Sequence, residues 1–312
     1  MTISSRRDIL LGTFSAAAGL TASSSLAGAL PRAVGFRAPQ SEDWFDISLA
    51  QWSLHRALRG GLDNLDFARV AREDYGVNGL EYVNSFFKSE AGNFEYLAKM
   101  KKAASDHGVK SLLIMVDGEG ALADEDATKR RKAVDNHFKW LAAAAYLGCH
   151  SIRVNAAGGG DRDEAERRAA ESLVHLAEIA TPYGLNVIVE NHGGLSSDGS
   201  WLSAVMRRAN HPRVGTLPDF GNFNLGGGKS YDRYKGVKEL MPFAKAVSAK
   251  THDFDGQGNE THTDYLAMMG IVKDAGYRGF VGIEYEGGGL SEKEGILATR
   301  RLLERVRGEL QD

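Results

Sequence analysis

The feature that most constrains the fold is an alternation, repeated eight times, of short apolar runs with longer segments of helical period. Short β-branched runs that alternate with amphipathic helices are typical of βα units around a parallel sheet. The predicted strands are residues 45–50, 79–83, 111–116, 151–155, 186–190, 213–219, 246–252 and 280–285. The predicted helices are residues 62–75, 93–107, 126–147, 163–183, 199–209, 231–241, 261–275 and 291–306.

The number of βα units and their total length predict a closed barrel. Eight strands and eight helices in about 265 residues match a single (β/α)8 TIM barrel, which we assign to residues 44–312. An open doubly wound sheet is the structural alternative. Its phosphate-binding signature, Gly-x-Gly-x-x-Gly between the first strand and the first helix, is absent from residues 51–61.

The N-terminus has the pattern of a bacterial export signal. Arg6 and Arg7 precede an apolar stretch over residues 9–20, and a run of small residues ends at Ala29. Adjacent arginines before such a stretch are typical of twin-arginine signals, although a helix with two chance arginines has the same composition. We expect an export signal over residues 1–30, a linker over 31–43 and export to the periplasm by the twin-arginine machinery. This stretch is too short to span a bilayer, and no later stretch reaches 18 apolar residues. The mature chain is therefore expected to have no stable membrane span.

Charge and cysteine content exclude other classes of protein. The 312 residues carry a formal net charge of -3, which supplies no broad basic surface for nucleic acid. Cys149 is the only cysteine, so the chain can form no internal disulfide and no cysteine-based zinc site. Any bound metal must therefore be held by oxygen and nitrogen ligands.

Polar residues gather where the last four predicted strands end, and there each strand offers one potential metal ligand: Glu190, Asp219, His252 and Glu284. The carboxyl ends of barrel strands share one mouth, where chemistry is usually found. A charge at the end of a buried strand is costly unless a metal or another partner meets it. Singly, each residue could be a salt-bridge partner, a cap or a rim residue, whereas four in register favour one divalent ion. We expect Mn²⁺, with Mg²⁺, Co²⁺, Fe²⁺ or Zn²⁺ as competitors.

Two more residues near these ligands are candidates for catalysis. Because side chains alternate along a strand, His192 shares a face with Glu190 and Lys250 shares one with His252. His192 could orient a hydroxyl or carry a proton, or be a rim histidine. Lys250 could polarise an oxygen or form a structural ion pair.

Further side chains are candidates for substrate binding. Arg153 and Asn155 alternate on the fourth strand and suit a carbonyl or hydroxyl ligand. Trp52 follows the first strand and could stack on a sugar or belong to the core. Glu81 on the second strand could line the site or form a salt bridge inside the barrel.

Four motifs carry a resemblance to a known family: Gly79-Leu80-Glu81-Tyr82-Val83-Asn84, Val189-Glu190-Asn191-His192, Pro218-Asp219-Phe220-Gly221-Asn222 and Gly282-Ile283-Glu284-Tyr285-Glu286-Gly287. With these motifs, nearly the whole mature chain resembles the xylose-isomerase-like barrel superfamily of sugar isomerases and epimerases. The resemblance implies that a Glu, an Asp, a His and a second Glu bind one divalent cation, and that the two glutamates act as base and acid. These positions fall on Glu190, Asp219, His252 and Glu284. Relatives often have His-x-His-x-Lys-Asp on strand seven, whereas here Ser248 stands two residues before Lys250.

The function expected from these residues is a metal-dependent isomerase or epimerase that moves a proton beside a carbonyl through an enediolate. Its substrate would be an unphosphorylated sugar or keto-sugar derivative. The alternative is a lyase that eliminates from, or cleaves, 3-oxo-glycosides on the same metal site. A sugar-binding protein without activity and a DNA-repair endonuclease are further alternatives, disfavoured by the four intact ligand positions and by the charge. Oligomeric state stays open, with a homo-oligomer among the alternatives.

Overall fold

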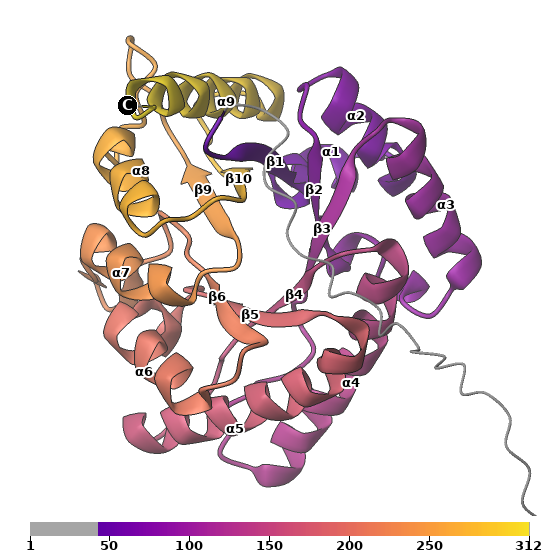
Figure 1. Cartoon of the computed structure of the whole chain (residues 1–312), viewed down its shortest axis with the longest axis vertical. Coiled ribbons are helices and arrows are strands. Elements are labelled where there is room, and N and C mark those ends of the chain that lie inside the picture. The colour runs from indigo at the N-terminus through magenta and orange to yellow at the C-terminus, as the bar shows by residue number, and fades with distance from the viewer. Residues whose placement is uncertain (1–42, 312) are drawn as a thin grey trace, which may run out of the picture. The chain divides into compact units, whose positions relative to one another are not determined.

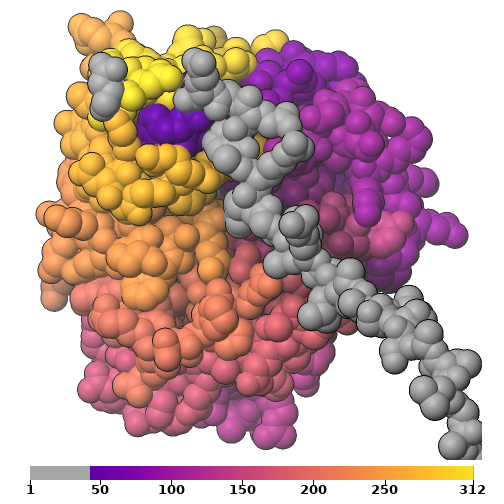
Figure 2. All heavy atoms as spheres, in the orientation of Figure 1, coloured from indigo at the N-terminus to yellow at the C-terminus, as the bar shows by residue number. Residues whose placement is uncertain are grey.

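Eight strands in the described part of the chain form one parallel sheet that curls into a barrel (Figure 1). The computed structural model describes residues 43–311. The strand order is β6-β5-β4-β3-β2-β1-β10-β9. Its members are β1 (Asp46–Ala50), β2 (Gly79–Val83), β3 (Lys110–Met115), β4 (Ser151–Val154), β5 (Asn186–Glu190), β6 (Val214–Leu217), β9 (Val247–Thr251) and β10 (Phe280–Tyr285). In Figure 2, the first described residues (indigo) lie against the last ones (yellow). The pairing of β1 with β10 brings these two ends of the barrel together.

The barrel closes between β9 and the segment after β6. The backbone N–H of Ser248 donates to the carbonyl of Pro218 at 2.9 Å, and that of Phe220 donates to the carbonyl of Ser248 at 3.2 Å. A parallel bridge between Asp219 and Ser248 lies at the same place. The predicted (β/α)8 barrel is therefore confirmed, and its closure places Asp219 beside β9.

Helices surround the sheet (Figure 1). They are α1 (His55–Arg59), α2 (Phe67–Glu73), α3 (Phe94–Asp106), α4 (Ala127–Leu147), α5 (Arg162–Ala180), α6 (Gly199–Ala209), α7 (Arg233–Leu240), α8 (Tyr265–Asp274) and α9 (Glu292–Glu309). Each helix from α3 to α9 begins at a side chain that accepts a hydrogen bond from the first turn, which satisfies N–H groups that have no partner within the helix. These caps are Asn93, Asp126, Asp161, Asp198, Asp232, Asp264 and Ser291.

Some element boundaries differ from the prediction. The first predicted helix, residues 62–75, shortens to α2, and the short helix α1 precedes it. Helix α8 begins at Tyr265 rather than residue 261 because Asp264 caps it. A small hairpin, β7 (Asn224–Gly226) with β8 (Lys229–Ser230), follows β6 and was not predicted.

Four strands also end earlier than predicted, and one of them is β3, which ends at Met115 rather than residue 116. Strand β4 ends at Val154, β6 at Leu217 and β9 at Thr251. Asp219 and His252 therefore lie in loops at the barrel mouth rather than in the sheet, where the alternation of a strand would fix their direction.

Two apolar clusters hold the barrel together. The larger cluster lies between the sheet and the helices. The smaller one fills the barrel interior and consists of Ala50, Val83, Leu113, Met115, Ile188, Leu217 and Ala246, with Trp52 and Phe86 packed against it. Polar side chains of the barrel strands are buried as well, so charged groups also occupy the barrel. The buried polar side chains include Glu81, Arg153, Glu190, Ser248, Lys250 and Glu284.

The N-terminal predictions cannot be compared with the fold. The expected export signal and the linker up to residue 42 lie outside the described residues. Within residues 43–311, no helix combines the length and the apolarity needed to cross a membrane.

Candidate metal centre

Three of the four predicted ligands come together inside the barrel mouth. Glu190 ends β5, Asp219 follows β6 and Glu284 lies in β10. One oxygen from each carboxylate lies within 4.8 Å of the others, and the three residues are at most 5% exposed. Around a cation with metal–oxygen distances of about 2.1 Å, octahedral ligand atoms stand about 3 to 4.2 Å apart. The spacing of this carboxylate triad is therefore compatible with one shared ion.

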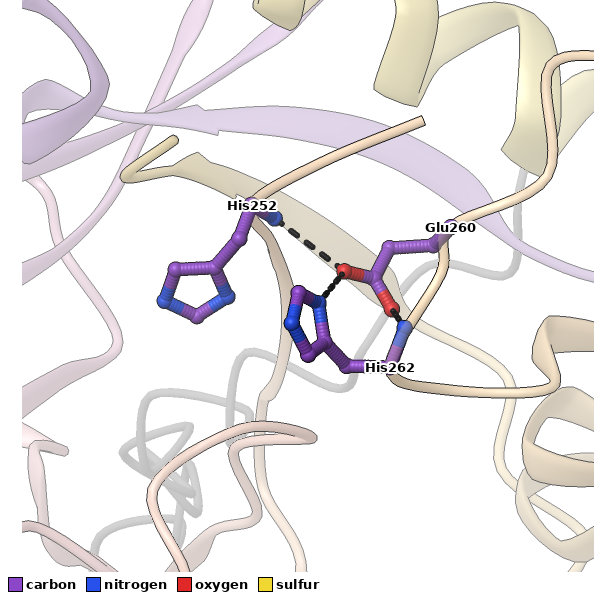
Figure 3. A group of neighbouring side chains, drawn as sticks. All are labelled: His252, Glu260 and His262. Carbon is purple, nitrogen blue, oxygen red and sulfur yellow. Dashed lines mark hydrogen bonds and ion pairs between the residues drawn. The ribbon is translucent and has the colours of Figure 1, made fainter. Parts of the chain in front are cut away.

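His252, the fourth predicted ligand, is not grouped with the carboxylate triad in the structure. It groups instead with Glu260 and His262 (Figure 3). Strand β9 ends at Thr251, so the alternation that places Ser248 and Lys250 inward no longer directs the next side chain. Ser248 and Lys250 line the side of the triad where an imidazole was expected.

Ser248 bridges two members of the triad. Its hydroxyl oxygen lies 2.8 Å from Asp219 Oδ2 and 2.8 Å from Glu284 Oε2. A hydroxyl has one hydrogen and can donate to one of these oxygens only. The second contact is favourable when the other carboxyl group carries a proton, or when both of its oxygens are neighbouring ligands of one cation.

Lys250 neutralises part of the negative charge. Its Nζ lies 3.2 Å from Glu284 Oε1, 3.6 Å from Asp219 Oδ2 and 3.1 Å from Glu286 Oε2. Burial opposes the charged form of this lysine, but the carboxylates outweigh burial and hold its pKa well above the usual value. Lys250 is thus an ammonium at neutral pH, paired with three carboxylates.

Arg153 occupies the opposite side of the group, next to Glu190. Its Nη1 donates to Asp117 Oδ1 at 2.7 Å, and the amide of Asn155 donates to the same oxygen at 2.7 Å. Arg153 Nε lies 2.9 Å from Glu190 Oε2, yet the alignment is not that of a hydrogen bond, and both buried atoms lack a hydrogen-bond partner. Glu190 Oε2 therefore has a lone pair that the described side chains do not satisfy. The two predicted substrate-binding residues Arg153 and Asn155 are both engaged by Asp117.

Glu81 lies within the barrel, apart from the triad. Its Oε1 accepts a hydrogen bond from Ser48 Oγ at 2.6 Å, and its buried Oε2 has no hydrogen-bond partner. Gly282 leaves the space for this carboxylate, because a Cβ at that position would lie 2.5 Å from Oε1. Burial raises the pKa of Glu81 to about 7, against the smaller opposite effect of Ser48.

The remaining predicted site residues lie at the rim. The indole N–H of Trp52 donates to Glu286, and the Trp52 ring stacks on His55 with centroids 5.0 Å apart. Trp52 is partly buried and packs on the small apolar cluster, so it forms a wall of the mouth. The His192 side chain is exposed, and its backbone N–H donates to Ser196 at 3.1 Å.

The triad fits a hard divalent cation on three observations. Its donor atoms are all oxygens, the donor type that Mg²⁺ and Mn²⁺ prefer. Burial raises the pKa of Glu190 and of Asp219, so without another cation the group retains a proton that a metal would displace. The unsatisfied Glu190 Oε2 and the shared hydroxyl of Ser248 are the atoms that such an ion would satisfy.

Sequence reasoning missed several residues of this site. Asp117 follows β3 and Glu286 follows β10, so the same strand-end rule that found the triad applied to both. Asn191 accepts from the backbone N–H of Asp219 at 2.8 Å, and Asn222 donates to Glu190 Oε1 at 2.9 Å. Both asparagines belong to the motifs that carry the family resemblance. Their position next to the carboxylates was a signal that their amides hydrogen-bond to Asp219 and Glu190.

Comparison with known proteins identifies the family. Residues 68–306 match the family model described as xylose isomerase-like TIM barrel, and the chain belongs to this family. A search of curated protein sequences gives no significant match.

Solved structures share the fold at low identity. The 3-keto-D-glucoside 4-epimerase YcjR from E. coli is 15% identical, with a TM-score of 0.66 over 84% of this chain and 99% of that protein. A D-psicose 3-epimerase solved with D-fructose is 15% identical, with a TM-score of 0.63 over 84% and 99%. The IOLI protein with a bound zinc atom is 15% identical, with a TM-score of 0.67 over 85% and 98%. Proteins that share this fold thus include sugar epimerases and a protein with a bound zinc atom.

The pKa of Glu81 predicts a pH effect on stability. The folded state holds the Glu81 proton up to about pH 7, whereas an unfolded glutamate loses it near pH 4.3. The native state then binds more protons, so stability falls as pH rises between these values, by about 3 kcal/mol from this group. In EDTA, the free energy of unfolding of the wild type should fall relative to that of Glu81→Gln between pH 4.5 and 7.5. Denaturant titrations at both pH values measure this difference, and parallel changes in the two proteins would contradict the assignment.

Proposed function

We propose that the protein is a divalent-metal-dependent sugar isomerase or epimerase, which moves a proton beside the carbonyl of an unphosphorylated sugar or keto-sugar derivative. The observation that carries the proposal is the convergence of Glu190, Asp219 and Glu284 within 4.8 Å inside the barrel mouth. Membership of a barrel family with sugar epimerases among its solved relatives supports the reaction class. Manganese is the metal we expect first, because the donor set consists of hard oxygens.

In this proposal Glu190 accepts the substrate proton. Its Oε2 is buried without a hydrogen bond, while Asn222 fixes Oε1 and Arg153 lies beside the free oxygen. Burial raises the pKa of Glu190, and beside a bound divalent cation this residue would stand as the carboxylate, which is the form that can accept a proton. A divalent cation held by the triad would stabilise the negative charge that develops on the substrate oxygen.

Glu284 donates its own proton to the opposite face of the intermediate and becomes a carboxylate, while Glu190 keeps the proton that it accepted, and exchange with solvent restores both groups. Lys250 lies 3.2 Å from its Oε1, and Ser248 lies 2.8 Å from its Oε2. These two groups fix the carboxyl and offer hydrogen bonds through which a proton can move. Lys250 has an electrostatic role in this scheme, since its three carboxylate contacts hold the ammonium charged.

The pairing of the cationic side chains favours an unphosphorylated substrate. Arg153 is engaged with Asp117 and Glu190, and Lys250 with three carboxylates. Neither charge is free to bind a phosphate group without breaking a buried ion pair, which costs several kcal/mol. Trp52 at the rim offers a flat apolar surface suited to a sugar ring or to the group attached to it.

Deuterium incorporation tests this reaction and separates it from the lyase alternative. The metal-loaded enzyme is incubated in deuterated water with free ketoses and with 3-oxo-glucosides, and the products are followed by NMR and mass spectrometry. We expect deuterium to be incorporated into an intact sugar. EDTA should abolish this incorporation, and Mn²⁺ should restore it. Release of an aglycone would favour the lyase, and turnover unaffected by chelation would contradict the metal dependence.

Substitution of the two glutamates tests their roles. Glu190→Gln and Glu284→Gln should each lower kcat by at least about 100-fold, because each removes a proton-transfer group and keeps its size. Glu178→Gln, at an exposed position on α5, is the matched control and should keep wild-type turnover. Circular dichroism verifies the fold, and near-normal turnover in either site variant would remove that residue from proton transfer.

We also propose that the protein is exported to the periplasm by the twin-arginine machinery, on the pattern of Arg6 and Arg7 before an apolar stretch. Residues 1–42 fused to a folded reporter should direct it to the periplasm, and the double change Arg6→Lys and Arg7→Lys should abolish export, because the machinery reads the arginine pair. Cell fractionation measures the reporter. Undiminished export of the doubly substituted fusion would contradict this route.

A further inference from the structure

A second group of ligand side chains lies at the barrel mouth, outside the carboxylate triad. His252, Glu260 and His262 each offer one ligand atom, and these atoms lie within 4.8 Å of one another. Figure 3 shows the two imidazole rings side by side, with the Glu260 carboxylate against His262. The ring centroids are 5.7 Å apart at an interplanar angle of 71°. Two imidazoles and one carboxylate are a ligand set found in zinc sites that keep a fourth position open.

The spacing within this histidine group suits direct ligation. His262 Nδ1 lies 3.0 Å from Glu260 Oε1. In a tetrahedral site with metal–ligand distances of about 2.05 Å, neighbouring ligand atoms stand about 3.3 Å apart. Small adjustments of the two side chains would therefore admit an ion between them, with His262 in the tautomer that carries its proton on Nε2.

The carboxylate of Glu260 is held in place independently of the histidine rings. Its Oε2 accepts from the backbone N–H groups of His262 at 2.7 Å and Thr263 at 2.5 Å. Its Oε1 has only the 3.3 Å contact with the backbone N–H of His252 and the contact with the His262 ring. One oxygen thus anchors the side chain, and the other remains available to an ion.

The loop that carries the group is also ordered by its own contacts. Phe254 and Glu260 form an antiparallel bridge. Asp255 Oδ1 accepts from the backbone N–H groups of Gln257 and Asn259, both at 2.9 Å. His252 follows the last residue of β9, so the group joins the end of this strand to the returning arm of the loop, which begins at Glu260. Ligands on preorganised backbone lose little conformational freedom on binding.

Solvent reaches the histidine group from outside the barrel. Glu260 and His262 line a cleft of about 750 Å³ whose other walls come from α7, α8 and α9. The His262 side chain is 51% exposed, whereas that of Glu260 is 1% exposed. An ion can therefore enter past His262 without passing through the carboxylate triad.

We propose that His252, Glu260 and His262 form a second metal site, which binds a transition metal of the Zn²⁺ class and pins the loop after β9 to the barrel mouth. Imidazole donors favour Zn²⁺ and Co²⁺, whereas the oxygen donors of the triad favour Mg²⁺ and Mn²⁺. The site does not depend on the proposed isomerase activity.

Cobalt titration of the full-length protein tests the site. Co²⁺ bound by imidazoles in a four- or five-coordinate site absorbs visible light more strongly than six-coordinate Co²⁺ held by oxygens. The wild type should develop such a band, and Zn²⁺ should abolish it by displacement. His252→Gln and His262→Gln should each weaken the apparent affinity by at least about tenfold, as expected for loss of one of three ligands.

Two controls separate this site from other metal binding. Glu190→Gln removes a member of the triad and should leave the cobalt band intact. His175→Gln, at an exposed position on α5, removes a histidine outside the group and should also leave it intact. A band that survives in both His252→Gln and His262→Gln overturns the proposal, as does loss of the band in Glu190→Gln or failure of the wild type to develop one. Circular dichroism verifies that each variant is folded. Because the His262 side chain is exposed, its substitution should disturb the fold less than that of His252.

Discussion

The burial of several carboxylates inside one barrel is the constraint on which the site depends. Each buried ion costs several kcal/mol unless opposite charge or hydrogen bonds compensate it. Lys250 and Arg153 supply two positive charges from β9 and β4, but Glu190, Asp219 and Glu284 carry three negative charges between them. Burial raises the pKa values of Glu190 and Asp219, and the nearby charge of Glu284 raises both further. A group that retains a proton at neutral pH for lack of a cation is prepared either to bind a metal or to exchange that proton with a substrate.

The barrel supplies the geometry that this charge requires. Parallel strands bring their carboxyl ends to one mouth, and closure between β9 and the segment after β6 sets Asp219 against Ser248. The asparagines next to the carboxylates fix them: Asn191 binds the backbone of Asp219, and Asn222 binds the side chain of Glu190. The arrangement of the triad is therefore held by contacts within the chain itself.

The fold, Glu190 and Glu284 were predictable from sequence because they follow from strand periodicity, whereas Asp219 lies two residues beyond the end of β6. Apolar runs that end in a carboxylate, such as Val189 before Glu190, mark both the buried strand and its polar end. His252 is not grouped with the triad because β9 ends one residue before it, and beyond that point the local loop contacts decide the direction of the side chain. Glu260 and His262 were not recognised because their meeting with His252 depends on a loop bridge between Phe254 and Glu260, which no periodicity encodes. Arg153 was correctly placed inward, but its engagement by Asp117 depends on a side chain from the loop after a neighbouring strand.

The serine at position 248 links the two candidate metal sites. With Ser248 beside the triad, the barrel interior presents only oxygen donors to a metal ion. A hydroxyl is a harder and weaker ligand than an imidazole. A triad with Ser248 beside it therefore favours Mg²⁺ and Mn²⁺, whereas a triad with an imidazole at this position would favour Zn²⁺. The imidazoles instead stand at the mouth, where His252 and His262 meet Glu260. Separation of donor types allows the two sites to select different ions in the presence of both, because a borderline ion binds more strongly to the histidines and a hard ion is left to the carboxylates.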